Sequence, residues 1–162
     1  MTASYASTML AQFDTNITLV TSESVNVSGG GFKASGYRFT PDKEPDSATN
    51  GLYYLDLSST TPKMRAFGTG ENFWNAQLTV QIGFYRGGGD MGGGSRRQVL
   101  DTANDDCMKV GDVCENPLNY NSTVSGIRSV RYTGHRRSFD LKSYEVWEVS
   151  FDVEWRSDVI TS

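Results

Sequence analysis

The residues of this chain that most resemble a binding site are six glycines that lie within residues 87–94. Gly87, Gly89 and Gly92 match the pattern G-x-G-x-x-G, in which backbone N–H groups between a strand and a helix hold a pyrophosphate. Glu115 follows roughly twenty residues later, the distance at which a dinucleotide fold places its ribose-binding acid. On this interpretation the chain is a nucleotide-binding enzyme.

The residues that flank the glycines count against a phosphate site. The preceding predicted strand, residues 74–85, alternates apolar and polar side chains, whereas a dinucleotide-binding strand is buried on both faces and apolar throughout. Asp90 adds a negative charge to the loop, and the lysine of a phosphate loop is missing because Gly94 precedes Ser95. We therefore interpret residues 87–94 as a flexible connector that contacts protein, and the nucleotide-binding enzyme stays an alternative.

Other nucleophilic, acid–base and metal-binding residue types do not form a recognisable site in the sequence. His135 is the only histidine, and its place between Gly134 and Arg136 predicts an exposed turn without a catalytic partner. Cys107 and Cys114 are two helical turns apart, too far for a mutual disulfide, and are expected as small core residues of a reduced protein. We therefore predict no catalytic residue, no metal site and no cofactor.

The last predicted strand, residues 147–155, carries an acidic side. Trp147 and the apolar residues in phase with it point one way, while Glu148, Asp152 and Glu154 point the other way. One interpretation is a solvated strand face. The other is a set of acids that line a channel through which DNA slides, because like charge repels phosphate and prevents trapping.

Arginines cluster separately from these acids. Arg96 and Arg97 open the second predicted helix, where the helix dipole disfavours cations. Further arginines lie around a predicted basic turn at residues 134–137. Either they are solvated at the surface, or they form salt bridges with the acidic face of a neighbouring subunit in a ring.

The elements that must position these residues follow from the spacing of apolar residues. Helical spacing predicts one helix over residues 3–13 and a second that follows Ser95 and stops at Asn116-Pro117. The buried side of the second helix is predicted to consist of Val99, Leu100, Ala103, Cys107, Val110 and Cys114, and its exposed side of Asp101, Asp105, Asp106 and Asp112. Pro62 is expected to end strand pairing, and residues 40–51 predict a protruding polar loop. The order of elements predicts an α+β fold with a mixed, largely antiparallel β-sheet and helices packed on one side. Predicted strands lie within residues 17–27, 52–57, 74–85, 124–132 and 147–155.

Length and composition limit the classes of protein to consider. The 162 residues predict one domain, residues 1–162. The formal net charge of −4 argues against a general nucleic-acid binder, which needs a basic surface. We find no signal peptide pattern and no apolar run of the ~20 residues that a membrane span needs. The chain is therefore expected to fold in the cytoplasm and to have no membrane partner.

This layout resembles the tail terminator (tail completion) proteins of long-tailed bacteriophages. The resemblance is carried by the strand residues 78–82, by the helix residues 99–113 with their segment Ala103-Asn104-Asp105-Asp106, and by the strand residues 147–153. It covers about two-thirds of the chain, mainly after Leu52. The glycine-rich residues 87–94 and the loop residues 40–51 have no counterpart in the family pattern.

The resemblance implies a structural protein of the virion, in the tail or neck, that is assembled in the host cytoplasm. Such subunits form a hexameric ring that caps the tail tube, stops its polymerisation and joins the tail to the head connector or stopper protein. DNA only passes through the lumen. The resemblance implies neither catalysis nor a cofactor.

The resemblance also gives the candidate residues a place in the ring. Glu148, Asp152 and Glu154 are the predicted lumen-facing acids. Two alternatives stay open: another head–tail neck or tail tube component, and the nucleotide-binding enzyme that uses residues 87–94. The predicted contacts with sister subunits, tube or connector are Asp90, Met91, Arg96, Arg97, Arg136 and Arg137.

Overall fold

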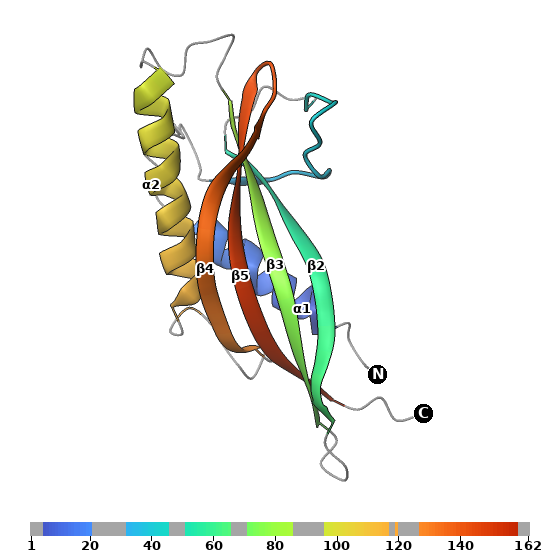
Figure 1. Cartoon of the computed structure of the whole chain (residues 1–162). Coiled ribbons are helices and arrows are strands. Elements are labelled where there is room, and N and C mark those ends of the chain that lie inside the picture. Colours follow the sequence, from blue (N-terminus) through green and yellow to red (C-terminus); the bar gives the residue numbers. More distant parts are fainter. Residues whose placement is uncertain are drawn as a thin grey trace.

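The computed structural model describes residues 5–20, 32–45, 51–65, 71–85, 96–116, 119 and 127–158 (Figure 1). Its sheet has five strands in the order β1-β2-β3-β5-β4, and all neighbours pair antiparallel except β1 with β2. The predicted α+β class with a mixed, largely antiparallel sheet is confirmed. The elements in chain order are α1 (Tyr5–Thr18), β1 (Lys33–Ala34), β2 (Leu52–Arg65), β3 (Glu71–Tyr85), α2 (Arg96–Glu115), β4 (Ile127–Asp140) and β5 (Tyr144–Asp158).

Both helices cover the same side of the sheet, which we call the helix face (Figure 1). Phe13 of α1 meets Phe151 of β5 edge-on, with ring centroids 5.5 Å apart. Tyr53 of β2 donates a hydrogen bond from its hydroxyl to Asp14 of α1 over 2.8 Å. Helix α2 packs against β4 and β5. The prediction of helices on one side of the sheet is therefore confirmed.

Helix α1 is longer than predicted. The sequence predicted a helix that ends near Phe13 and a strand that begins at Ile17, but α1 continues to Thr18. Ile17 is four residues after Phe13 and is fully buried with it in the core. Burial on the apolar stripe of the helix outweighs the weak preference of a β-branched residue for a strand.

Strands β3 and β5 confirm the predicted alternation. They pair without interruption from Glu71 opposite Asp158 to Tyr85 opposite Tyr144. Every second side chain of both strands enters the core on the helix face. The buried residues of this phase are Ala76, Leu78, Val80, Ile82, Phe84, Trp147, Val149, Phe151, Val153 and Trp155.

Strand β2 does not end at Pro62, contrary to the sequence prediction. Pro62 lies opposite Trp74 of β3, and β2 continues to Arg65. Proline is tolerated here because β1 pairs only with Leu52 and Tyr53, so the outer edge of β2 at Pro62 needs no N–H toward a described neighbour. The register of β2 against β3 shifts directly after Pro62, between Pro62 and Met64.

The predicted basic turn at residues 134–137 is wrong, because these residues are part of strand β4. The register of β4 against β5 shifts between Tyr132 and Gly134, and Gly134 has a φ of 141°, which other residues rarely adopt. This bulge inserts one residue into the strand. As a result Tyr132 and His135, three positions apart, lie opposite Phe151 and Val149 and both point to the helix face.

The inner side of helix α2 agrees with the prediction at four residues and differs at one. Ala103, Cys107, Val110 and Cys114 are fully buried, and the helix ends at Glu115, directly before Asn116. Asp106 was expected at the surface but is fully buried as well. It lies three residues after Ala103 and four before Val110, so it falls within the buried stripe.

The side of the sheet opposite the helices carries a second, smaller core at one end. Phe39 lies over the sheet there, and Gln81 bonds to its backbone from both amide atoms, over 3.1 and 3.4 Å. Gln81 and Gly83 were expected on a solvated face but are buried under this segment. No pattern in the sequence predicted that residues 32–45 fold back over the strands. The cluster consists of Phe39, Leu52, Leu141, Tyr144 and Val146.

Candidate interaction surface

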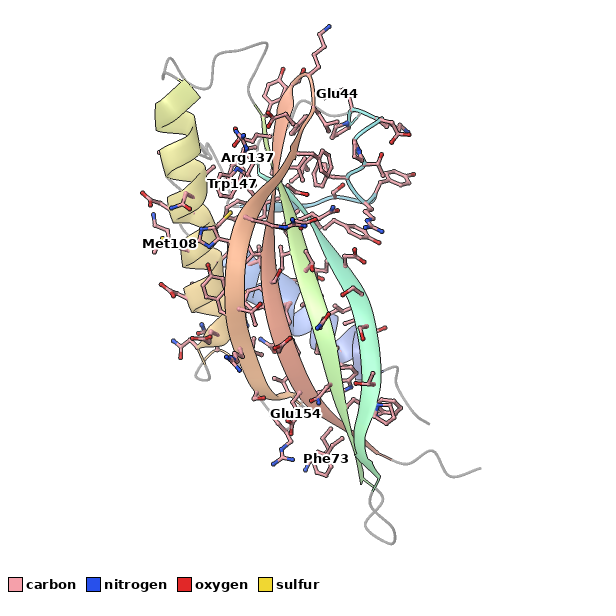
Figure 2. All side chains as sticks on the ribbon, in the orientation of Figure 1. Glu44, Phe73, Met108, Arg137, Trp147 and Glu154 are labelled. Carbon is pink, nitrogen blue, oxygen red and sulfur yellow. The ribbon has the colours of Figure 1, made fainter. Side chains whose placement is uncertain are left out.

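The remainder of that side of the sheet is free of described helices and is covered by polar and charged side chains; we call it the polar face. Cross-strand partners share a side of a sheet, so the pairing register defines its members. Figure 2 shows the polar face toward the viewer, with Glu154 and Phe73 near its lower end. Its members include Asp56, Ser59, Thr61, Phe73, Asn75, Gln77, Thr79, Arg128, Ser129, Arg131, Arg136, Glu148, Ser150, Asp152 and Glu154.

Rows of complementary groups run across the strands of the polar face. Asp152 of β5 lies opposite Arg131 of β4 on one side and Gln77 of β3 on the other. Glu148 lies opposite Arg136 in the same manner. Glu148 and Asp152 of β5 therefore each have an arginine on the neighbouring edge strand β4 at the spacing at which cross-strand pairs interact.

Two arginine–glutamate pairs on the polar face are closed ion pairs. The Nε and Nη2 atoms of Arg136 donate to the same Oε2 atom of Glu148 over 3.2 and 3.0 Å. Arg128 places Nη1 3.4 Å from Glu154 Oε1, and its guanidinium lies 4.5 Å above the centre of the Phe73 ring. Glu148 and Glu154, two of the three predicted lumen-facing acids, are thus paired with arginines of the same chain.

A shallow hollow of about 370 Å³ lies on the polar face and crosses all four long strands. It is bordered by both signs of charge, with Arg131 facing Asp152 and Glu154. Hydroxyl and amide groups of β2 and β3, among them Ser59 and Gln77, complete its lining. A surface of this kind binds water well and offers no concentrated charge to a polyanion.

The six predicted contact residues do not come together as one described surface. Asp90 and Met91, with the other glycine-loop residues 87–94, lie outside the described residues. Arg96 and Arg97 open α2, as predicted, and their side chains are outside the described set. Arg136 belongs to the polar face, but Arg137 follows it in the strand and points to the helix face.

Arg137 has a partner that sequence reasoning missed. Its Nη1 atom is 3.9 Å from Oε1 of Glu145, which is fully buried. The same carboxylate oxygen accepts a hydrogen bond from Trp147 Nε1 over 2.9 Å. The two-residue period of the strand could have predicted the burial of Glu145, because Glu145 is two residues before Trp147 and shares its buried side.

His135 is half-buried between β4 and α2 and is not the exposed turn residue that was predicted. Its Nδ1 atom is hydrogen-bonded to the Tyr132 hydroxyl, and its Nε2 atom lies 2.7 Å from Asn104 Oδ1 of α2. A neutral ring with its proton on Nε2 satisfies both contacts, since the tyrosine then donates to Nδ1. Burial lowers the pKa of His135 and thereby favours this neutral form.

The contacts among Tyr132, His135 and Asn104 link β4 to α2. Tyr132 also donates its backbone N–H to Glu115 Oε2 over 2.6 Å, so the same strand residue contacts two turns of the helix. Burial raises the pKa of the Tyr132 hydroxyl, which keeps it protonated and poorly suited to act as a nucleophile.

Comparisons with known protein families and with curated proteins find no match for this chain. Neither helix in the described part of the chain is long and apolar enough to cross a membrane. The functional argument therefore rests on the surfaces of the fold.

Proposed function

We propose that this chain is a ring-forming structural protein of a bacteriophage virion, a tail terminator that caps the tail tube and joins it to the head connector while DNA passes through its lumen. The observation that supports this proposal is the polar face, a long sheet surface of paired charges on the side opposite the helices. It adds to the family resemblance of the sequence.

The charge pairing of the polar face suits a passage for DNA. A basic lumen would hold the phosphate backbone, and a strongly acidic lumen would raise the energy of every phosphate that enters. On the polar face Arg136 and Arg128 offset Glu148 and Glu154 within one chain. The surface therefore stays hydrated and close to neutral, so that DNA slides past without being retained.

Assembly is the first property to test. Size-exclusion chromatography with light scattering, on the chain alone and with the tube protein of the same phage, is expected to show a closed assembly of several 17.9-kDa chains that binds tube ends. Growing tubes should shorten when the protein is added during their polymerisation. A strict monomer that binds neither tube nor connector would refute the proposal. Self-assembly into long tubes would favour a tube subunit instead.

The lumen assignment has its own test. A variant with Glu148, Asp152 and Glu154 changed to Lys should still assemble but should reduce phage yield, because it joins lysines to arginines on one surface that then binds phosphate. The matched control exchanges one pair, Arg136→Glu with Glu148→Arg, and preserves the balance of charge. Normal yield from the triple variant would show that the polar face points away from DNA.

A further inference from the structure

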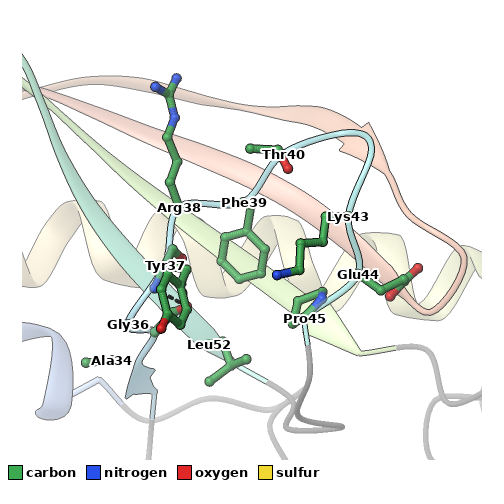
Figure 3. A pocket seen from close by; sticks show the side chains of 11 residues that line it. Ala34, Gly36, Tyr37, Arg38, Phe39, Thr40, Lys43, Glu44, Pro45 and Leu52 are labelled. Atoms are coloured by element: carbon green, nitrogen blue, oxygen red, sulfur yellow. Dashed lines mark hydrogen bonds between the residues drawn. The ribbon is translucent and has the colours of Figure 1, made fainter.

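A hollow of about 350 Å³ lies between the segment 34–45 and the start of β2, on the opposite side of the molecule from helix α2 (Figures 1 and 3). Its floor is apolar and includes Phe39 and Leu52. Tyr37 stands at its border with 81% of its surface exposed. A large exposed aromatic ring beside an apolar hollow is typical of a protein contact site.

The hollow also carries positive charge. Figure 3 shows Lys43 beside the Phe39 ring, while Arg38 and Glu44 point away from it. In the described part of the chain the ammonium group of Lys43 has no ion pair, whereas Arg38 is 3.5 Å from Asp56 and Glu44 accepts a hydrogen bond from Ser143. The hollow therefore combines an apolar floor with one uncompensated cation.

The outer side of helix α2 presents the complementary pattern. Met108 is 48% exposed, although it is a large apolar residue in the middle of the helix. Asp105 precedes it by three residues and Asp112 follows it by four, so all three lie on one side of α2. Both aspartates are exposed, and neither forms an ion pair with a described residue. Lys109 lies between them on the same side of α2, so this surface carries one net negative charge.

From these two surfaces we propose that the hollow receives helix α2 of a second copy of this chain. Met108 of one copy enters the hollow of the next, where its thioether meets Tyr37 and the floor at Phe39. Asp105 and Asp112 then approach Lys43. The argument for a second copy is charge complementarity: Asp105 and Asp112 flank the exposed methionine and Lys43 borders the hollow, and none of the three forms an ion pair within the described part of the chain.

The contact is heterologous, since different patches of the two copies meet. Figures 1 and 2 show α2 with Met108 on one side of the sheet and the segment 34–45 on the other. A contact between such patches continues from copy to copy and closes into a ring when the rotation permits. The inference rests on the proposed ring and specifies which surfaces build it.

Charge reversal tests the contact by sedimentation velocity over a concentration series. Lys43→Glu and Asp105→Lys are each expected to weaken association about tenfold, and the double variant should recover most of that loss. The matched control is Lys142→Glu, an exposed lysine of the turn between β4 and β5, which should associate like the unmodified chain. Single reversals that associate normally would overturn the inference while the ring proposal stands.

Site-directed cross-linking tests the direction of the contact. Tyr37→Cys and Met108→Cys proteins are mixed and treated with a short bismaleimide; the native cysteines are buried and serve as an unreactive background. A cross-linked dimer is expected in the mixture and not in either protein alone, because the contact is head to tail. No cross-link in a sample that light scattering shows to be assembled would refute this interface, and a sample that never assembles would refute the ring as well.

Discussion

The helix face and the polar face are built by the same strands but differ in the side chains that they carry and in how much these stabilise the fold. On the helix face, successive inward residues of β3 and β5 are buried against two helices. On the polar face, the residues between them hold cross-strand ion pairs that remain in contact with water. Burial of apolar area contributes several kcal/mol for a large side chain, whereas an exposed ion pair contributes about 1 kcal/mol or less. The comparison assigns most of the stability to the helix face and leaves the polar face as a hydrated surface of paired charges.

The largest expected effect comes from the helix face. Phe151→Ala should lower the free energy of unfolding by about 3–5 kcal/mol, because Phe151 packs against Phe13 and Tyr132. Urea denaturation followed by fluorescence measures this change. The neighbouring substitution Asp152→Ala, on the polar face, should stay within about 0.5 kcal/mol. Equal losses of unfolding free energy in the two variants would show that the helix face does not contribute more stability than the polar face.

A smaller effect is expected where the second core covers the sheet. In Gly83→Ala the new Cβ would lie 2.7 Å from two ring atoms of Phe39, so the ring and its segment must shift. We expect a loss of about 1–3 kcal/mol of unfolding free energy, measured as above. Gly36→Ala is the control, since nothing lies within 4 Å of a Cβ there. A neutral Gly83→Ala would mean that Phe39 is not held against the sheet.

The link between α2 and β4 should make stability depend on pH. Burial lowers the pKa of His135 in the folded chain, so the unfolded chain takes up the proton more readily below about pH 6.5. The contribution of neutral His135 to the free energy of unfolding is complete above about pH 6.5 and is lost as the pH falls toward its lower pKa in the folded chain. Thermal unfolding between pH 5 and 8 should show a slope that His135→Gln reduces, because carboxylates provide the remaining slope.

The smallest effect belongs to the polar face itself. Arg136→Ala should cost about 1 kcal/mol or less, because the arginine side chain is 75% exposed and water screens its bond to Glu148. A double-mutant cycle with Glu148→Ala isolates the coupling between the two residues. A coupling well above 1 kcal/mol would indicate that the polar face stabilises the fold as well as presenting charge.

Local periodicity was sufficient to predict the elements that lie on the helix face. The alternation of β5 from Trp147 onward and the three- or four-residue spacing of α2 both gave the correct buried side. Asp106 and Glu145 fell in the same buried phases, but their charge made a surface position seem the simpler expectation. In both cases position along the element was a better guide than residue type.

Features that depend on distant partners were beyond local reasoning. Pro62 is typical of a strand end, and it is tolerated because β2 has no described neighbour on its outer side there. Gly134 and His135 are typical of a turn, but pairing with β5 makes them part of a bulged strand. Gln81 appears solvated until Phe39 covers it. The candidate contact patches have the same origin, since Met108 and Tyr37 differ from core residues only through what the fold leaves uncovered.

The two thiols on the inner side of α2 can report how often this helix separates from the sheet. Both Cys107 and Cys114 are fully buried, and burial raises the pKa of the Cys114 thiol to about 12. A thiol reagent in neutral solution therefore reacts only when the helix lifts from the strands. At a reagent concentration high enough for every opening to be trapped, the rate at which the unaltered chain consumes the reagent measures the lifetime of that docked state.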